Sequence, residues 1–176
     1  MADKFDRDFS RQSNARGVSK ILSIVRHRNL LALYLVRRAE KNNNRYGKIL
    51  QRVGSSLFEH SGIEVSPSDN IGGGLLLVHP YGITINSRSK IGEDFTIFKG
   101  ATIGSIRSGK KQGTPTIGNR VTVCANAMVC GKITIGDDVL IAANALVNFD
   151  VPSNSIVIGN PGVIHHKSEP STDYLD

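Results

Sequence analysis

The sequence predicts a mainly β protein in which a parallel β-helix of hexapeptide repeats follows a short α-helical segment. Two observations predict this class. From residue 63 onward an aliphatic residue recurs at every sixth position, whereas before residue 63 apolar residues recur at helical spacing. At a hydrophobic content of 39%, so regular a six-residue period is not expected by chance. We expect a helical segment over 1–62, the β-helix over 63–164 and a tail over 165–176.

The helical segment is strongly basic. Its apolar spacing and the interrupting NNNRYG predict two or three amphipathic helices between residues 18 and 60. In the stretch 16–52, ten Lys and Arg residues face one acid, Glu40. Such a surface suits nucleic acid, an anionic membrane or cofactor phosphates, or it is simply a solvated face. We exclude nucleic acid, because aromatics are few and no known nucleic-acid motif accompanies the charges.

The six-residue period runs in three series, each with one phase. They are Val65, Ile71, Leu77, Ile83; then Ile85, Ile91, Ile97, Ile103; then Ile117, Val123, Val129, Ile135, Ile141, Val147. Glycine often follows the aliphatic residue, and we expect its backbone freedom to help the chain turn. Three hexapeptides, each a short strand and a corner, make a coil of about eighteen residues, and coils stack about 4.8 Å apart.

Two breaks in the period indicate where function lies, since a solenoid gains nothing by interrupting its own stacking. The first is the two-residue step from Ile83 to Ile85, just after His79. The second is the insertion between Ile103 and Ile117, which predicts a flexible basic flap. The alternatives are a hydrogen-bonded packing role for His79 and a tolerated insertion for the flap.

LLLVHPYGITIN, IGEDFTIFKGATIGS, the flap and VPSNSIVIGNPGVI resemble the serine acetyltransferase branch of the left-handed β-helix acyltransferases. The resemblance covers residues 63–164 and implies a left-handed coil. RHRNLLALYLVRRAE also resembles the end of the family's helical domain, which is longer in full-length members. The resemblance implies an O-acetyltransferase that uses acetyl-CoA as co-substrate and needs no metal.

The resemblance also implies roles for particular residues. His79 matches the general base, which an alcohol nucleophile needs at neutral pH. Glu64, fifteen residues earlier, stands where the family carries the aspartate partner of that base, and we expect it one coil below a point three residues beyond His79. Backbone N–H groups of Gly104 and Ser105 match the oxyanion site beside the cofactor. The alternative for Glu64 is an ordinary surface carboxylate.

For the cofactor, Ala125 and Ala143 match the small-residue positions along which the family lays the pantetheine arm. Lys110, Lys111 and Lys167 are candidates for the CoA phosphates, with solvated lysines as the alternative. Cys124 and Cys130, in a chain without a secretion signal, are interpreted as reduced and structural, and we expect neither to act as a nucleophile.

The acceptor site departs from the family pattern. Serine acetyltransferases carry an aspartate before the histidine and an Arg-His pair at the end of the flap, where this chain has Val78, Gly113 and Thr114. Val78 and Thr114 therefore favour a neutral hydroxyl, such as that of a saccharide for surface polysaccharide, over free L-serine. The alternatives are a true serine O-acetyltransferase of cysteine biosynthesis and, in a different class, an inactive β-helix assembly module. A zinc carbonic anhydrase is disfavoured, because His79 is the only histidine in 63–164.

The remaining expectations concern assembly and location. The resemblance implies a homotrimer with active sites between chains, and a hexamer where a longer helical domain pairs two trimers. If the acceptor is lipid-linked, Arg26, Arg28, Arg37 and Arg38 are candidates to hold the protein near an anionic membrane. The charged N-terminus, with no long apolar run, predicts a cytoplasmic protein.

Overall fold

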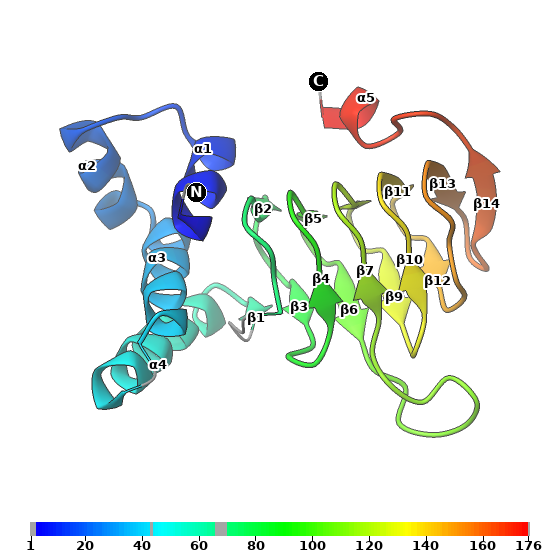
Figure 1. Ribbon diagram of the computed structural model, residues 1–176, viewed down its shortest axis with the longest axis horizontal. Coiled ribbons are helices and arrows are strands. Elements are labelled where there is room, and N and C mark those ends of the chain that lie inside the picture. The colour runs from blue at the N-terminus through cyan, green and yellow to red at the C-terminus, as the bar shows by residue number, and fades with distance from the viewer. Residues whose placement is uncertain (1–2, 43, 66–69, 176) are drawn as a thin grey trace.

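The computed structural model describes residues 3–42, 44–65 and 70–175, and it is a left-handed parallel β-helix with helices packed on its first coil (Figure 1). The helices are α1 (Lys4–Gln12), α2 (Val18–Arg26), α3 (Arg28–Glu40), α4 (Arg45–Glu59) and the short α5 (Thr172–Leu175). The predicted fold class is confirmed. Helix α1 was not predicted from the sequence. No helix in the described part of the chain is both long and apolar enough to cross a membrane.

Three stacks of short strands form the walls of the β-helix. The five-stranded stack contains β1 (Glu64–Val65), β3 (Thr84–Ile85), β6 (Thr102–Gly104), β9 (Met128–Cys130) and β12 (Leu146–Val147). The three-stranded stack contains β4 (Lys90–Ile91), β7 (Thr116–Ile117) and β10 (Thr134–Ile135). The six-stranded stack contains β2 (Leu76–Val78), β5 (Thr96–Phe98), β8 (Thr122–Val123), β11 (Val139–Ile141), β13 (Ser155–Ile158) and β14 (Val163–His166).

Every aliphatic residue of the three predicted series is buried. The assignment of Ile83 to the first series was wrong. The residue that stacks between Val65 and Ile103 is Ile85, because Val65 pairs with Ile85 and Ile85 with Ile103. Ile83 precedes Thr84, the partner of Thr102, so it stands level with Ala101 at a second inward position. A hexapeptide thus points two residues inward, two positions apart, and the residue between them points outward.

Coil length varies while the stacking register is kept. Val65 and Ile85 are twenty residues apart, Ile85 and Ile103 eighteen, and Ile103 and Val129 twenty-six. The two extra residues fall in the turn that carries His79, and the eight extra residues form the flap. Both breaks in the period are therefore real enlargements of single corners.

Glycine follows the buried aliphatic residue for a reason other than the one we expected. Gly72, Gly92, Gly118 and Gly136 follow Ile71, Ile91, Ile117 and Ile135, which pair along one stack, and none of the four has positive φ. A Cβ at Gly92 would lie 2.7 Å from the backbone of Gly118, and one at Gly118 2.8 Å from that of Gly136. These glycines are needed because neighbouring coils approach too closely for a side chain.

The helices cover the open edge of the first coil. Asp8 of α1 is fully buried, and its Oδ1 accepts hydrogen bonds from the N–H groups of Gly74 and Leu75, both at 2.7 Å. Arg37 of α3 donates to the carbonyls of Ile71 and Gly72 at 2.8 and 2.6 Å and pairs with Asp8 at 2.8 Å. Arg37 is only 3% exposed, so its expected membrane role is wrong.

At the other end of the stack, β14 folds back antiparallel onto β13 and continues two residues past the boundary we expected at 164. The chain then turns back along the six-stranded stack (Figure 1). There the Tyr174 ring packs edge-on against Phe98, with ring centroids 5.9 Å apart, and the Ser171 hydroxyl bonds that of Thr122 at 2.7 Å.

Candidate active site

Two corners of the β-helix hold the predicted site residues. The histidine corner comprises the turns 78–82, 98–100, 124–126 and 142–144, and the flap corner comprises the turns 86–90, 104–116, 130–133 and 148–150. They stand at opposite edges of the five-stranded stack, because β3, β6, β9 and β12 each follow a turn of the first corner and precede a turn of the second.

The His79 turn is the enlarged turn at the start of the histidine corner. His79 follows strand β2, is exposed, and has a φ of +47°, a left-handed conformation that is uncommon for a residue with a side chain. Asn126 and Asn144 of the same corner also have positive φ, so this conformation belongs to the corner as a whole and not to His79 alone. The turn is held from the next coil, since the N–H groups of Lys99 and Gly100 donate to the carbonyls of Val78 and Tyr81 at 3.1 and 2.9 Å.

Above His79 the histidine corner continues as a column of turns. The Asn126 N–H donates to the carbonyl of Lys99 at 3.0 Å, and the Asn144 N–H donates to that of Ala125 at 3.0 Å. Val78, His79, Ala125 and Ala143 therefore share one corner, with small side chains on its upper turns. Exposed Lys99 stands between them and was missed in the sequence, although it occupies the corner position of Ala125 one coil earlier.

Glu64 lies close to this corner but not where we expected. Its coil has twenty residues instead of eighteen, so it pairs with Thr84, five residues beyond His79 and not three. Its N–H donates to the carbonyl of Ile83 at 2.7 Å, and its side chain is exposed. Within 3–42, 44–65 and 70–175, no hydrogen bond or ion pair joins Glu64 to His79, and the pairing stays a prediction.

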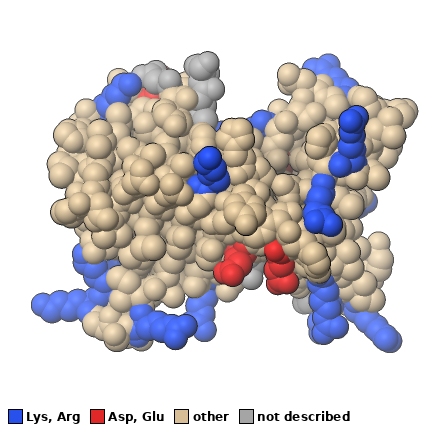
Figure 2. All heavy atoms as spheres, turned by 180° about the vertical axis from the view of Figure 1, so that it is seen from behind, with Lys and Arg blue, Asp and Glu red and all other residues tan. Residues whose placement is uncertain are grey.

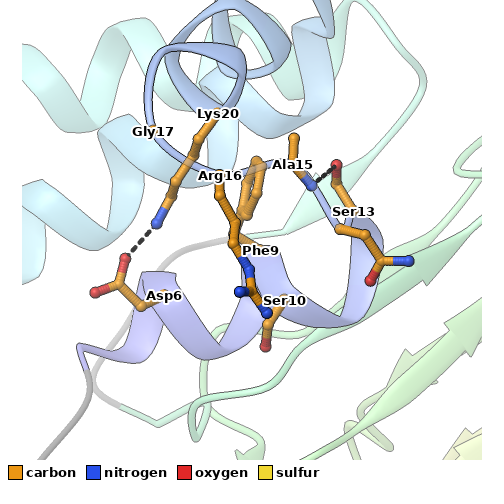
Figure 3. A pocket seen from close by; sticks show the side chains of 9 residues that line it. Asp6, Phe9, Ser10, Ser13, Ala15, Arg16, Gly17 and Lys20 are labelled. Atoms are coloured by element: carbon orange, nitrogen blue, oxygen red, sulfur yellow. Dashed lines mark hydrogen bonds and ion pairs between the residues drawn. The ribbon is translucent and has the colours of Figure 1, made fainter.

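A hollow of about 330 Å³ lies beside Glu64. Ser55 and Glu59 of α4 form one side of it, and Glu64, Asn86 and the backbone around Thr84 form the other. The α4 residues were missed because nothing in a helical pattern shows which strand the helix will meet. A larger hollow of about 500 Å³, between α1 and the start of α2, contains none of the predicted site residues (Figure 3).

The flap is more ordered than we expected. Ile106 and Gly113 form an antiparallel bridge with two N–H to carbonyl bonds of 3.0 Å, which closes residues 107–112 into a hairpin. The hairpin is fixed to later coils, because the Lys132 N–H donates to the Lys111 carbonyl at 2.9 Å and the Lys111 ammonium donates to the Asn148 carbonyl. Lys110 is exposed beside it.

The oxyanion candidates form the root of the flap. Gly104 ends strand β6 opposite Cys130, and a Cβ at Gly104 would meet nothing closer than 3.6 Å. Ser105 is exposed, and among the described residues no hydrogen bond uses its backbone N–H. Thr114, at the end of the flap, donates to the Arg88 carbonyl at 3.1 Å. A free backbone N–H on an exposed residue is what an oxyanion site requires.

Both cysteines are free thiols. Burial raises the pKa of the Cys124 thiol, and it also raises that of Cys130 above the ordinary value of 9.0, despite the opposing charge of Lys111. A thiol needs its thiolate form to attack, so both are poor nucleophiles at neutral pH.

The structure thus gathers one group of predicted residues at the histidine corner and another, comprising Gly104, Ser105, Lys110, Lys111 and Thr114, at the flap corner. Lys167 joins neither, since its N–H donates at 3.1 Å to the carbonyl of Asn154, at the remaining corner. In the described part of the chain, no group of three His, Cys, Asp or Glu side chains is placed to hold a metal ion.

Comparisons with known proteins agree with this architecture. A family model described as bacterial transferase hexapeptide (six repeats) matches residues 114–148. The serine acetyltransferase of Helicobacter pylori is 41% identical over 100 residues, which cover 57% of this chain and 58% of that protein. The chain thus spans little more than half the length of this relative.

Other relatives match over nearly the whole chain. The serine acetyltransferase of Staphylococcus epidermidis is 31% identical over 165 residues, covering 93% of this chain and 76% of that protein. The crystal structure of Neisseria gonorrhoeae serine acetyltransferase in complex with serine has a TM-score of 0.71 at 25% identity, over 92% of this chain and 67% of that one. The soybean serine acetyltransferase apoenzyme has a TM-score of 0.73 at 25% identity, with the same coverage. The chain therefore belongs to the serine acetyltransferase family.

Proposed function

We propose that this protein transfers an acetyl group from acetyl-CoA to a hydroxyl of its acceptor, with His79 as general base. The observation that carries the proposal is the His79 turn: an exposed imidazole on the one enlarged turn of the histidine corner, in a chain of this family. Imidazole titrates near neutral pH, so it can take a proton from an alcohol and return it within one catalytic cycle.

The reaction needs a base, an oxyanion donor and a path for the leaving group. His79 removes the acceptor proton while the oxygen attacks the thioester carbon, and the free N–H of Ser105 stabilises the tetrahedral oxyanion. As the carbon–sulfur bond breaks, the imidazolium protonates the departing CoA thiolate. Glu64 would hold the imidazole in one tautomer, as a carboxylate does in other hydroxyl-activating sites. If Glu64→Gln leaves the pH–rate profile unchanged, this role for Glu64 is wrong.

The separation of the two corners supports an active site built between chains. In one chain His79 and Ser105 stand at opposite edges of the five-stranded stack, so we propose a homotrimer in which the histidine corner of one chain faces the flap corner of the next. Acetyl-CoA would lie between them, its pantetheine arm beside Ala125 and Ala143 and its phosphates near Lys110 and Lys111. Lys167 has no part in this arrangement.

Mixing two inactive variants tests this shared site. His79→Ala lacks the base, and a deletion of residues 107–112 lacks the hairpin that borders the oxyanion donor. Dissociated and reassembled together, they should recover part of the wild-type rate, since some junctions combine two intact corners. Each variant reassembled alone is the control. Failure of the mixture to exceed the two controls would place the whole site in one chain.

For the acceptor we propose a neutral hydroxyl of a saccharide. Val78 and Thr114 bring no charge to the site, and the hollow beside Glu64 offers oxygen and amide groups that suit sugar hydroxyls. The competing acceptor is L-serine, which is favoured by the names of the relatives and by the structure of the Neisseria gonorrhoeae enzyme with serine. L-serine would be costly to bind here, because neither Val78 nor Thr114 can pair with the charge of its carboxylate.

The decisive measurement is kcat/KM for L-serine and for a panel of saccharides, with acetyl-CoA as donor. His79→Ala should lower kcat about 10²- to 10⁴-fold, the usual contribution of a general base. His60→Ala is the matched control, because His60 is also exposed but bonds only the Ser56 carbonyl. Equal activity of the two variants would contradict the proposed base. A kcat/KM for L-serine above about 10⁴ M⁻¹s⁻¹ would make serine the acceptor.

A further inference from the structure

Helix α2 presents an apolar stripe to solvent. Val18, Ile21, Leu22 and Val25 are 74, 63, 65 and 67% exposed, and no residue of α2 is buried. Their spacing of three, four and seven residues places them on one face of the helix. We call these four residues the α2 stripe.

The opposite face of α2 fixes the direction of the stripe. Lys20 reaches across to Asp6 of α1, with a nitrogen-to-oxygen distance of 2.6 Å, as Figure 3 shows. Ile24 is half-buried and packs against the core. Around the helix axis, Lys20 lies roughly 150° and Ile24 roughly 110° from the middle of the stripe. This attachment leaves all four aliphatic side chains exposed, and Ile21 and Val25 also border a hollow of about 500 Å³ that α1 and α3 line on the other side.

Positive charge predominates around the stripe, because Asp3 and Asp6, the acids that border a hollow shared with Ile21 and Val25, are already paired with Lys41 and Lys20. Arg16, Arg26 and Arg28, at the two ends of α2, are exposed. Glu40, the single acid between residues 16 and 58, is turned inward and occupied by Lys4 and Arg37. In the rear view, Lys and Arg side chains are spread over the helical end and over the coils, and two acidic side chains lie where the two parts meet (Figure 2).

We propose that the α2 stripe docks the protein on an anionic lipid bilayer. A bilayer interface offers apolar chains for Val18, Ile21, Leu22 and Val25 and negative phosphates for Arg26 and Arg28, the combination that interfacial amphipathic helices use. A second copy of the chain fits less well. In a twofold contact the stripe would meet itself, and the same arginines would repel across the interface. The proposal rests on this surface alone and not on the proposed reaction.

Vesicle co-sedimentation of the full chain tests the docking. Wild-type protein should bind vesicles containing anionic phosphatidylglycerol at least tenfold more tightly than neutral phosphatidylcholine vesicles, and salt should weaken that binding. Ile21→Asn with Leu22→Asn should lower the affinity for anionic vesicles at least tenfold, and Arg26→Gln with Arg28→Gln should do the same. The matched control is Ile158→Asn with Val163→Asn, an aliphatic pair 50 and 56% exposed at the opposite end of the stack. It should keep wild-type affinity. Circular dichroism checks that each variant folds.

Three results would overturn the proposal. One is equal binding, or no binding, of the wild type to the two kinds of vesicle. Another is an equal loss for the α2 pair and the control pair. The third comes from sedimentation without lipid: if the α2 pair converts a larger assembly into a smaller one, a second copy covers the stripe. None of these measurements uses acetyl transfer, so failure of the proposed function leaves the test intact.

Discussion

Ile141 in the coils is completely buried, whereas Ile21 in helix α2, an identical side chain, is 63% exposed. The difference comes from how each region obtains an interior. A coil encloses its own inner space, so every side chain that points inward is covered by the coils before and after it. A helix has no interior and buries a stripe only where another element covers it, as α4 covers part of α3.

The two regions meet at Asp8, and its removal should give the largest effect on stability. Asp8→Ala would leave Arg37 buried without its main partner and the N–H groups of Gly74 and Leu75 unpaired. We expect a loss of about 3–5 kcal/mol in the free energy of unfolding, as for other broken buried ion pairs. Urea denaturation at fixed protein concentration measures it.

The matched control is Asp6→Ala on the same helix. Asp6 pairs with Lys20, but its side chain is 54% exposed. The control should therefore lose less than about 1 kcal/mol. Equal losses for the two variants would mean that α1 does not stabilise the coils through its buried charge.

The next prediction sets the two isoleucines against each other. Ile141→Ala should lower the free energy of unfolding by about 2–5 kcal/mol, because it opens a cavity that the stacked coils cannot fill. Ile21→Ala should change it by less than about 0.5 kcal/mol, since its side chain is already in water. Thermal unfolding of the two variants measures the contrast, and a large loss for Ile21→Ala would show that the α2 stripe is covered in solution.

The smallest effect concerns two glycines within the coils. Gly118→Ala should cost about 1–3 kcal/mol, because the new methyl group would lie 2.8 Å from the backbone of Gly136. Gly104→Ala should cost less, since its methyl group would have at least 3.6 Å of clearance. Urea midpoints of the two variants decide it. If both are equally destabilised, close stacking is not what requires glycine after the buried aliphatic residue.

Most of the β-helix could be predicted from the sequence, because a six-residue period leaves little freedom in what each residue contacts. The assignment of Ile83 was the exception. Ile83 lies six residues after Leu77, but the two extra residues of the His79 turn make Ile85 the residue that stacks between Val65 and Ile103. The level of Glu64 was misplaced for the same reason. Both errors were avoidable, because the two-residue step between Ile83 and Ile85 already indicates a first coil of twenty residues.

The helical segment was predictable in kind but not in its contacts. Helix α1 has few apolar residues, and it is attached through Asp8 and two buried phenylalanines rather than by a long hydrophobic face. From the sequence, Arg37 cannot be distinguished from the other cations of the helical segment, yet it is buried and donates hydrogen bonds to carbonyl groups of the first coil. Hydrophobic periodicity carries no signal for a charged side chain whose partners are backbone atoms of a distant strand.

The covered ends of the stack limit how copies of this protein can assemble. A parallel sheet whose edge strand is uncovered offers unpaired N–H and carbonyl groups to further strands, and edge-to-edge filaments grow in this way. Here charged side chains of α1 and α3 bind backbone groups of the first coil, and β14 pairs antiparallel with β13, the last parallel strand of the six-stranded stack. End-on growth is thereby discouraged at both ends, and the sides and corners remain for contact. Contacts made sideways close into rings of fixed size, so the covered ends favour a finite particle over a fibre.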